Sequence, residues 1–464
     1  MRPPEVTGLR SRAEALAWLA VIALCLGGAL LFGSVPERAG LRLGLLVAAG
    51  AAWWRALVVA GRSGIGRAEL VGGLLLLHGI ALASRPELSD DVYRCVWEGE
   101  VLARGGSPYA FAPDAPELAE LRSDLPGLHA RVNNPEIPAI YPPLSQLASL
   151  AAVEAGRVLP FGGEEPWRRA VLVVRLLVTA CAVALLVPLL ALLRRAGRPA
   201  GMAVAWAWSP LVALEFAGSG HLDALGILLW VLALAVLAAG RGARGGALVV
   251  AAGLVKYLPL ASLPFALREL RASSRKRAVL AAVLVAVAGF APLLFLRGGP
   301  AGLFVALSEY GFRWESASLL YRFVEAPLAS FFERDLSATD PRRLGRLVAA
   351  AAWAAVGAYA WLRGAGAVRA SYLLAGGFLL FSPTLHPWYL AWIAPFLALY
   401  PARAWRFLLA AAPLAYWPLA RWQGEGVWAE PAWWWPAVGL PFLALLLASV
   451  LRPAAPLAVH GRRP

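Results

Sequence analysis

The chain has 464 residues, of which 60% are hydrophobic and only 15% are charged, and its mean hydropathy is +0.65. Apolar runs of bilayer length recur from Ala13 almost to the C-terminus, which excludes an ordinary soluble protein and predicts an all-α polytopic membrane protein. The net charge of +15 comes from short arginine clusters between these runs. Such clusters are typical of cytoplasmic loops, so they argue against nucleic acid as a partner.

Three membrane spans are predicted in the N-terminal segment, residues 1–84, near 13–33, 41–60 and 68–84. Arginines precede the first span, and positive residues prefer the cytoplasmic side, so the N-terminus is predicted to be cytoplasmic. After three crossings the next segment, residues 85–141, would face the outside. This segment is a large extracytoplasmic loop in an otherwise apolar chain.

The extracytoplasmic loop begins with Ser89-Asp90-Asp91-Val92-Tyr93-Arg94. Adjacent carboxylates at the edge of a bilayer are costly unless chemistry uses them. Helical spacing of apolar residues from Asp90 to Leu102 predicts a short helix on the membrane surface. Ser89 could simply cap this helix, with the two aspartates in its first turn. Alternatively, one aspartate accepts a proton from a hydroxyl nucleophile, or both bind a divalent cation.

A central transmembrane bundle is predicted over residues 142–296. Arginines at 241 and 244 and at 268–277 all favour the cytoplasm, although a single apolar run separates them, so this run should break near Lys256 and Pro259. Lys256 either snorkels to an interface or contacts a phosphate. Residues 142–159 are either re-entrant or inconsistent with the arginine pattern. About 13–14 crossings are expected in all, from about 20 residues per span.

Two further polar groups precede the C-terminal segment. Gly218-Ser219-Gly220-His221-Leu222-Asp223 places a histidine and an acid at a helix junction. An outer loop, residues 297–341, gathers basic and aromatic side chains, among them Arg313, Trp314 and Arg322. Aromatic residues of this kind line a membrane interface without any ligand, but beside carboxylates and arginines they also suit a sugar.

C-terminal transmembrane helices are predicted over residues 342–464, and the arginines there place His386 on the outer side. His386 lies between two prolines, at 383 and 387, and is followed by Trp388 and Tyr389. A lone histidine at a helix end is often structural. A broken backbone at this depth is instead typical of a segment that lines a cavity.

These motifs resemble the polyprenol-phosphate-sugar-dependent glycosyltransferases of the C-type fold (GT-C), in particular bacterial mannosyltransferase-like membrane proteins. The matching pieces run in order from 85 to 400: Ser89–Gly99, Ser107-Pro108-Tyr109, Ile140–Leu144, Ser219–Ala224, Leu254-Val255-Lys256 and His386–Tyr389. Two features depart from the family pattern: about three spans precede the acidic loop, where many relatives have one, and Leu222 stands where a polar residue is expected.

The resemblance implies a transferase that moves mannose or another hexose from a polyprenyl phosphate to a lipid or glycan acceptor, with inversion, at the outer face of the bacterial inner membrane. Asp90 or Asp91 would be the base. The residues expected to bind substrate are Arg94, Tyr141, His221, Asp223, Lys256, Arg313, Trp314, Arg322, His386, Trp388 and Tyr389. No cofactor would be required and no metal ligands are assigned, although a divalent metal is compatible with the paired acids.

Two other functions fit a similar cavity. A transporter or flippase for a lipid-linked saccharide would place its polar groups on broken helices near the midplane, usually in two related halves. A polymerase or ligase of lipid-linked glycans would share the outer site but transfer an oligosaccharide. Membrane lipids surround the protein in every case.

Overall fold

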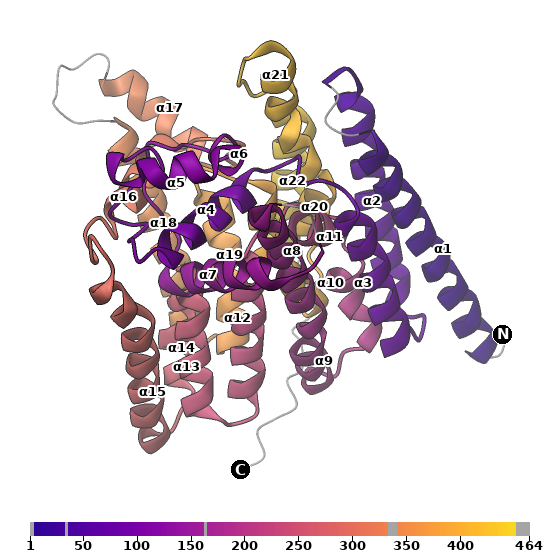
Figure 1. The fold of residues 1–464 in the computed structure, drawn as a ribbon. Coiled ribbons are helices and arrows are strands. Elements are labelled where there is room, and N and C mark those ends of the chain that lie inside the picture. Colours follow the sequence, from indigo (N-terminus) through magenta and orange to yellow (C-terminus); the bar gives the residue numbers. More distant parts are fainter. Residues whose placement is uncertain (1–3, 33–35, 162–164, 333–340, 452–464) are drawn as a thin grey trace. The chain divides into compact units, whose positions relative to one another are not determined.

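The computed structural model describes residues 4–32, 36–161, 165–332 and 341–451 (Figure 1). Every regular element in these ranges is a helix, and the only extended pairings there are two isolated bridges, between Gly106 and Arg297 and between Ser316 and Thr384. The predicted all-α membrane fold is therefore confirmed. The chain forms two compact units, which are described separately: a first unit of residues 1–84, 186–214 and 387–464, and a second unit of residues 85–185 and 215–386.

The first unit is built on apolar helices that follow the predicted N-terminal spans. These are α1 (Pro4–Leu31), α2 (Ala39–Ala60) and α3 (Arg67–Leu82). α2 also packs against α20 (Arg403–Ala411). The contact is close because Gly50 has no side chain: a Cβ atom there would lie 2.6 Å from Cα of Ala410.

The C-terminal part of the first unit is more broken than its hydropathy suggests. The predicted C-terminal transmembrane helices are split after Pro387 at several prolines, which cannot donate a backbone hydrogen bond and so interrupt a helix. The pieces are η7 (Pro387–Trp392), η8 (Ala394–Ala398), α20, η9 (Ala412–Tyr416), α21 (Trp417–Glu425), η10 (Trp435–Gly439) and α22 (Leu440–Leu451). The middle of this unit adds α9 (Leu186–Arg195), η3 (Ala200–Ala203), α10 (Val204–Ala207) and α11 (Pro210–Ala213).

The second unit combines a helical bundle with residues 85–141, the segment predicted as an extracytoplasmic loop and called the insertion below. The bundle contains α8 (Pro166–Ala184), α12 (Asp223–Ala238), α13 (Gly242–Gly253) and α15 (Ala272–Phe290). The predicted surface helix is α4 (Asp91–Ala103), which confirms the expected helix over Asp90 to Leu102. α7 (Pro143–Val158) lies across the ends of α12 and α13 and packs on α4 (Figure 1). Because α7 lies crosswise, residues 142–159 need not be counted as a crossing.

The predicted break near Lys256 is confirmed. α13 ends at Gly253, the chain turns through Lys256, and η5 (Leu258–Ser262) and α14 (Leu263–Arg268) then return along α13. The arginines at 241 and 244 and those at 268–277 consequently lie at the same end of the bundle. A Pro at position 259, early in η5, fits this abrupt change of direction.

The segment predicted as an outer loop, residues 297–341, contains two helices within its described part. These are α16 (Val305–Arg313) and α17 (Tyr321–Phe332), and α18 (Pro341–Leu362) and α19 (Ala367–Phe381) follow them. The small elements of the insertion are η2 (Pro116–Leu118), α5 (Ala119–Asp124) and α6 (Pro126–His129).

Within the described residues, five helices are long and apolar enough to cross a membrane, or six if the bent pair Ala200–Ala207 and Pro210–Gly218 forms one span. Shorter apolar helices, such as Asp223–Ala238 and Ala367–Phe381, fall below that length. The multi-pass character is clear from these helices. The number of about 13–14 crossings stays a prediction. It was obtained by counting apolar runs, and several of these runs are divided into short helices at prolines and glycines.

Candidate active site

The two aspartates start α4, but their side chains are not used to cap it. Asp90 is the N-cap residue and makes no side-chain cap hydrogen bond. Ser89 Oγ accepts only a long bond, 3.3 Å, from the backbone N–H of Asp91. Both carboxylates instead accept hydrogen bonds from Asn133 Nδ2, at 2.6 Å for Asp90 Oδ1 and 2.8 Å for Asp91 Oδ1. Capping of the surface helix therefore does not account for the pair.

Asp91 also faces Tyr141 and His221. The Tyr141 hydroxyl donates to Asp91 Oδ2 at 3.4 Å, and His221 Nδ1 lies 3.7 Å from the same oxygen. His221 reaches this position from a turn that requires glycine. Gly220 has φ of +82°, and a Cβ atom there would lie 2.8 Å from Val92 on α4. This close approach brings the predicted His221 motif to the start of α4.

A third carboxylate, Glu215, lies on the other side of the imidazole. Glu215 Oε2 is 3.4 Å from His221 Nε2, and both side chains are almost completely buried. Glu215 belongs to a π-helical turn, Leu214–Gly218 (η4), an irregular element that is frequent at functional sites. The imidazole is thus held between the carboxylates of Asp91 and Glu215.

Lys256 and Asp223 form an ion pair. Lys256 Nζ lies 2.6 Å from Asp223 Oδ1; the Asp223 side chain is 2% exposed and that of Lys256 is 19% exposed. Asp223 is the first residue of α12, and Lys256 lies in the turn after α13. The break in the apolar run therefore places Lys256 beside the predicted motif that contains His221 and Asp223. This position favours the predicted role of Lys256 at the site over simple snorkelling to a membrane interface.

His386 belongs to the same cluster. Its imidazole is within electrostatic range of Asp91, Asp223, Lys256 and His221. Burial lowers the pKa of His386 to about 4, and the nearby Asp91 carboxylate offsets this only in part. The imidazole is consequently neutral at pH 7, so it can donate or accept a hydrogen bond but supplies no full positive charge.

The surroundings of Asp90 favour protonation of its carboxyl group. Removal from water by the surrounding protein raises the pKa of the Asp90 carboxyl, and the adjacent charge of Asp91 raises it further. The hydrogen bond from Asn133 and the nearby His221 act in the opposite direction. Asp90 keeps an exposed surface, so the pair can be reached from water.

Arg94, predicted to bind substrate, is occupied by the protein itself. Its Nε donates to Glu98 at 2.9 Å, its Nη1 donates to the carbonyls of Asn133 and Asn134, each at 2.9 Å, and its Nη2 donates to the carbonyl of Ile137. The side chain is buried. The structure therefore favours a positioning role for Arg94.

The remaining predicted residues are Trp388, Tyr389, Trp314, Arg322 and Arg313. Trp388 and Tyr389 belong to the first unit, where their rings meet edge to face at 5.8 Å. The carbonyl of Trp314 accepts a 2.7 Å bond from Thr384, which ties its loop to the residues before His386. Arg322 lies in the first turn of α17. Arg313 ends α16, and its side chain lies outside the described ones.

Sequence reasoning missed Asn133 and Glu215. Glu215 carried a usable signal, because an acid inside an apolar run is expensive in a membrane and is often functional. Asn133 lies in the sequence Asn133-Asn134-Pro135, and nothing in that sequence identifies its partners.

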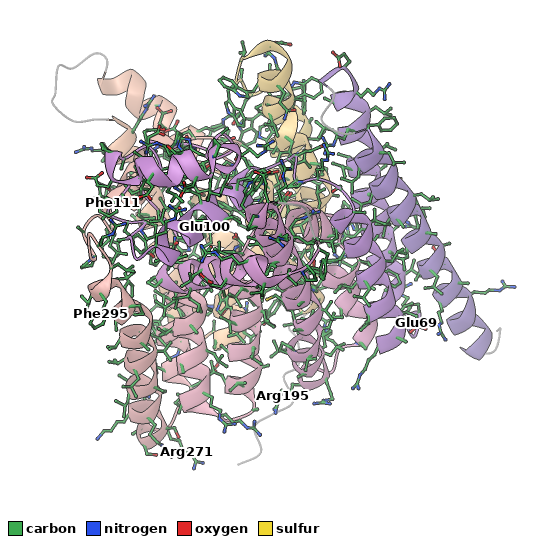
Figure 2. The ribbon with its side chains drawn as sticks, viewed as in Figure 1. Glu69, Glu100, Phe111, Arg195, Arg271 and Phe295 are labelled. Carbon is green, nitrogen blue, oxygen red and sulfur yellow. The ribbon has the colours of Figure 1, made fainter. Side chains whose placement is uncertain are left out.

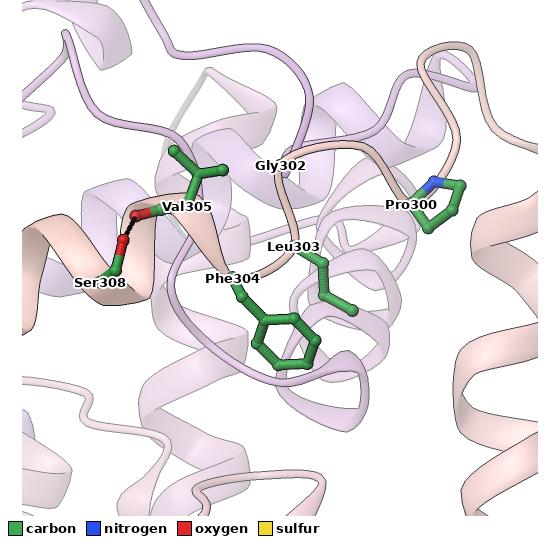
Figure 3. Close-up of a pocket in the computed structure, with 6 residues that line it drawn as sticks. All are labelled: Pro300, Gly302, Leu303, Phe304, Val305 and Ser308. Atoms are coloured by element: carbon green, nitrogen blue, oxygen red, sulfur yellow. Dashed lines mark hydrogen bonds between the residues drawn. The ribbon is translucent and has the colours of Figure 1, made fainter.

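An open apolar hollow lies elsewhere in the second unit, along Pro300, Gly302, Leu303, Phe304, Val305 and Ser308 (Figure 3). None of the clustered polar residues lines it, so it is not the reaction site. Among the described residues, no three His, Cys, Asp or Glu side chains are placed to hold a metal ion.

Residues 36–272, slightly more than half of the chain, match the family of alpha-(1->6)-mannopyranosyltransferases over its N-terminal domain. No curated protein matches the chain. The matched range includes the aspartate pair, Asn133, His221 and Lys256, whereas His386 lies beyond it. The membrane helices and this match agree with the resemblance seen in the motifs. The chain therefore belongs to the alpha-(1->6)-mannopyranosyltransferase family of membrane glycosyltransferases.

Proposed function

We propose that this membrane glycosyltransferase transfers mannose from a polyprenyl-phosphate donor to a hydroxyl group of a lipid or glycan acceptor on the extracytoplasmic side, with inversion at the anomeric carbon. The observation that carries the proposal is the aspartate pair at the start of α4, which lies beside His221 and is grouped through His386 with Lys256. Acid, imidazole and ammonium groups from four separated segments meet there. Such convergence of titratable groups is characteristic of catalytic sites.

Asp91 is the proposed base. Its Oδ2 atom faces Tyr141 and His221. Among the nearby charges, the Asp91 carboxylate has the largest effect on the pKa of His386. As the acceptor oxygen bonds to the anomeric carbon, Asp91 takes the hydroxyl proton and the bond from carbon to the phosphate oxygen breaks. Attack occurs opposite the leaving phosphate, so the configuration inverts. The sugar gains positive charge in the transition state, which neighbouring carboxylates stabilise.

The leaving phosphate needs positive charge and hydrogen-bond donors, but no proton donor. Lys256 is the proposed cation, with part of its charge balanced by Asp223, and neutral His386 is the proposed hydrogen-bond donor. Fixed groups of this kind stabilise charge as it develops without reorganising during the reaction.

The extracytoplasmic location is supported by the two ends of the bundle in the second unit. In Figure 2, Arg271 lies at one end of α15 and Phe295 near the other, beside the insertion that carries Glu100. Arginine-rich ends prefer the cytoplasm, which leaves the α4 end for the outside. The polar groups collect at that one end, which favours an enzyme over a transporter with polar groups at the midplane.

The test is sugar transfer in vitro. Purified protein in lipid nanodiscs receives a radiolabelled polyprenyl-phosphate mannose and a mannoside acceptor, and Asp91→Asn is expected to lower turnover by about 10³-fold or more, by analogy with loss of other preorganised catalytic groups. Glu120→Gln, which changes an exposed carboxylate of the same insertion, is the matched control and should retain the parent rate. Transfer by Asp91→Asn at the parent rate would remove Asp91 as the base. Product length separates single-sugar transfer from ligation of an oligosaccharide.

A further inference from the structure

We propose that Asn133 is a positioning residue that holds Asp90 and Asp91 as one unit and leaves Oδ2 of Asp91 as the atom that accepts the proton. The inference deepens the proposed function and rests on it for the identity of the base. It concerns a residue outside the acidic motif, 42 positions along the chain from Asp91.

The amide of Asn133 serves both acids at once. One side-chain nitrogen lies 2.6 Å from Asp90 Oδ1 and 2.8 Å from Asp91 Oδ1. An amide NH₂ group has two hydrogens, so each carboxylate can receive one of them. The opposite orientation would place the amide carbonyl against two carboxylates, acceptor against acceptor. The chemistry of the partners therefore fixes the orientation of the amide.

This arrangement distinguishes the oxygen atoms of Asp91. Oδ1 is occupied by the Asn133 donor, whereas Oδ2 faces the Tyr141 hydroxyl at 3.4 Å and His221 Nδ1 at 3.7 Å. A proton placed on Oδ1 would weaken the bond from Asn133, because it would take up a lone pair of the same oxygen, whereas a proton on Oδ2 would leave that bond in place. The acceptor hydroxyl should consequently approach from the side of Tyr141 and His221.

Asn133 is itself held from α4. Arg94, three residues after Asp91, donates to the carbonyls of Asn133, Asn134 and Ile137. Its Nε pairs with Glu98, which also accepts a 2.7 Å bond from Gln146 on α7. Helix α4 therefore begins with the two aspartates and also carries Arg94, whose guanidinium group holds the backbone around Asn133. This geometry gives the buried Arg94 a purpose that needs no contact with substrate.

Infrared titration of the carboxyl groups tests the proposal without any assay of transfer. Protonated-carboxyl bands of the full-length protein would be followed against pH and assigned by their loss in Asp90→Asn and Asp91→Asn. Donors to a carboxylate favour its charged form, and the Asn133 donor lowers the pKa of Asp90 in this way, so Asn133→Leu should move the protonation midpoint of Asp90 upward by about 1–2 pH units. Asn133→Ser, with one O–H donor, should give a smaller upward shift and is a milder change for folding.

The control is Asn134→Gly. Asn134 has φ of +43°, which glycine adopts without strain, and only its backbone carbonyl contacts Arg94, so the protonation midpoint of Asn134→Gly should equal that of the parent.

In transfer assays, Asn133→Ser should lower kcat by about 10-fold or more through misplacement of the base, with the acidic limb of the pH–rate profile shifted upward and the KM for the donor little changed. A midpoint that stays at the parent value in both Asn133 variants would overturn the proposal, even if transfer itself were confirmed. A shifted midpoint in a protein that transfers no sugar would instead refute the proposed function alone.

Discussion

Two helix contacts, one in each unit, are equally close but differ in what surrounds them. α2 approaches α20 at Gly50, where an added Cβ would lie 2.6 Å from Cα of Ala410, and α4 approaches α7 at Gly99, where it would lie 2.6 Å from the carbonyl oxygen of Ser149. The α4 contact also encloses a buried ion pair, Arg94 with Glu98. At the first contact the close approach of two backbones limits what can be accommodated, and at the second contact paired charges that hold the segment around the acids add to that constraint.

Removing one charge of the buried pair should have the largest effect on stability. Arg94→Leu leaves Glu98 buried without its cation and releases three loop carbonyls, so we expect a loss of about 3–5 kcal/mol in the free energy of unfolding. Denaturant unfolding in detergent micelles measures this loss. Arg104→Leu is the matched control, because Arg104 pairs with Asp124 at the more exposed end of α4, where such a pair contributes about 1 kcal/mol or less. Equal losses in both variants would show that the buried Arg94–Glu98 pair contributes no more to stability than the exposed Arg104–Asp124 pair.

Adding a methyl group at each close contact sharpens the comparison. Gly50→Ala and Gly99→Ala should each cost about 1–3 kcal/mol, because backbone atoms must shift to admit the new Cβ. Only Gly99→Ala should also reduce turnover beyond the unfolded fraction, since α4 carries the aspartates. Gly44→Ala, on α2 with nothing within 4 Å of an added Cβ, should cause no loss. Calorimetric Tm values and single-turnover transfer rates together decide whether the effects separate in this way.

Local features of this fold could be predicted from the sequence, and distant pairings could not. The surface helix from Asp91 follows from apolar spacing, and the turn at Lys256 follows from arginine clusters on both sides of one apolar run. The short helices after Pro387 were missed because hydropathy averages composition and does not register the backbone donors that prolines remove.

The candidate site shows the same limit. Asp91, His221, Lys256 and His386 stand out as polar residues in apolar surroundings, and the fold brings them together. Arg94 stood out equally, yet besides Glu98 its partners are the backbone carbonyls of residues 133, 134 and 137, which no motif reveals. Chemical type can be read from a sequence, whereas the partner of a charge depends on the folded chain.

The smallest expected effect is on thermal stability: removing the charge of Asp90 should raise the Tm slightly at pH 7. Because burial and Asp91 raise the pKa of Asp90 in the folded protein, the folded state binds this proton more tightly than the unfolded state. Its contribution to stability is therefore greatest in acid and declines as pH rises through the folded pKa. Asp90→Asn should melt slightly above the parent at pH 7, and the difference should vanish on acidification. Glu117→Gln, at another exposed acid of the insertion, should track the parent at every pH. A lower Tm for Asp90→Asn at pH 7 would show that the second unit gains more from Asp90 as a hydrogen-bond acceptor than it loses from two adjacent charges.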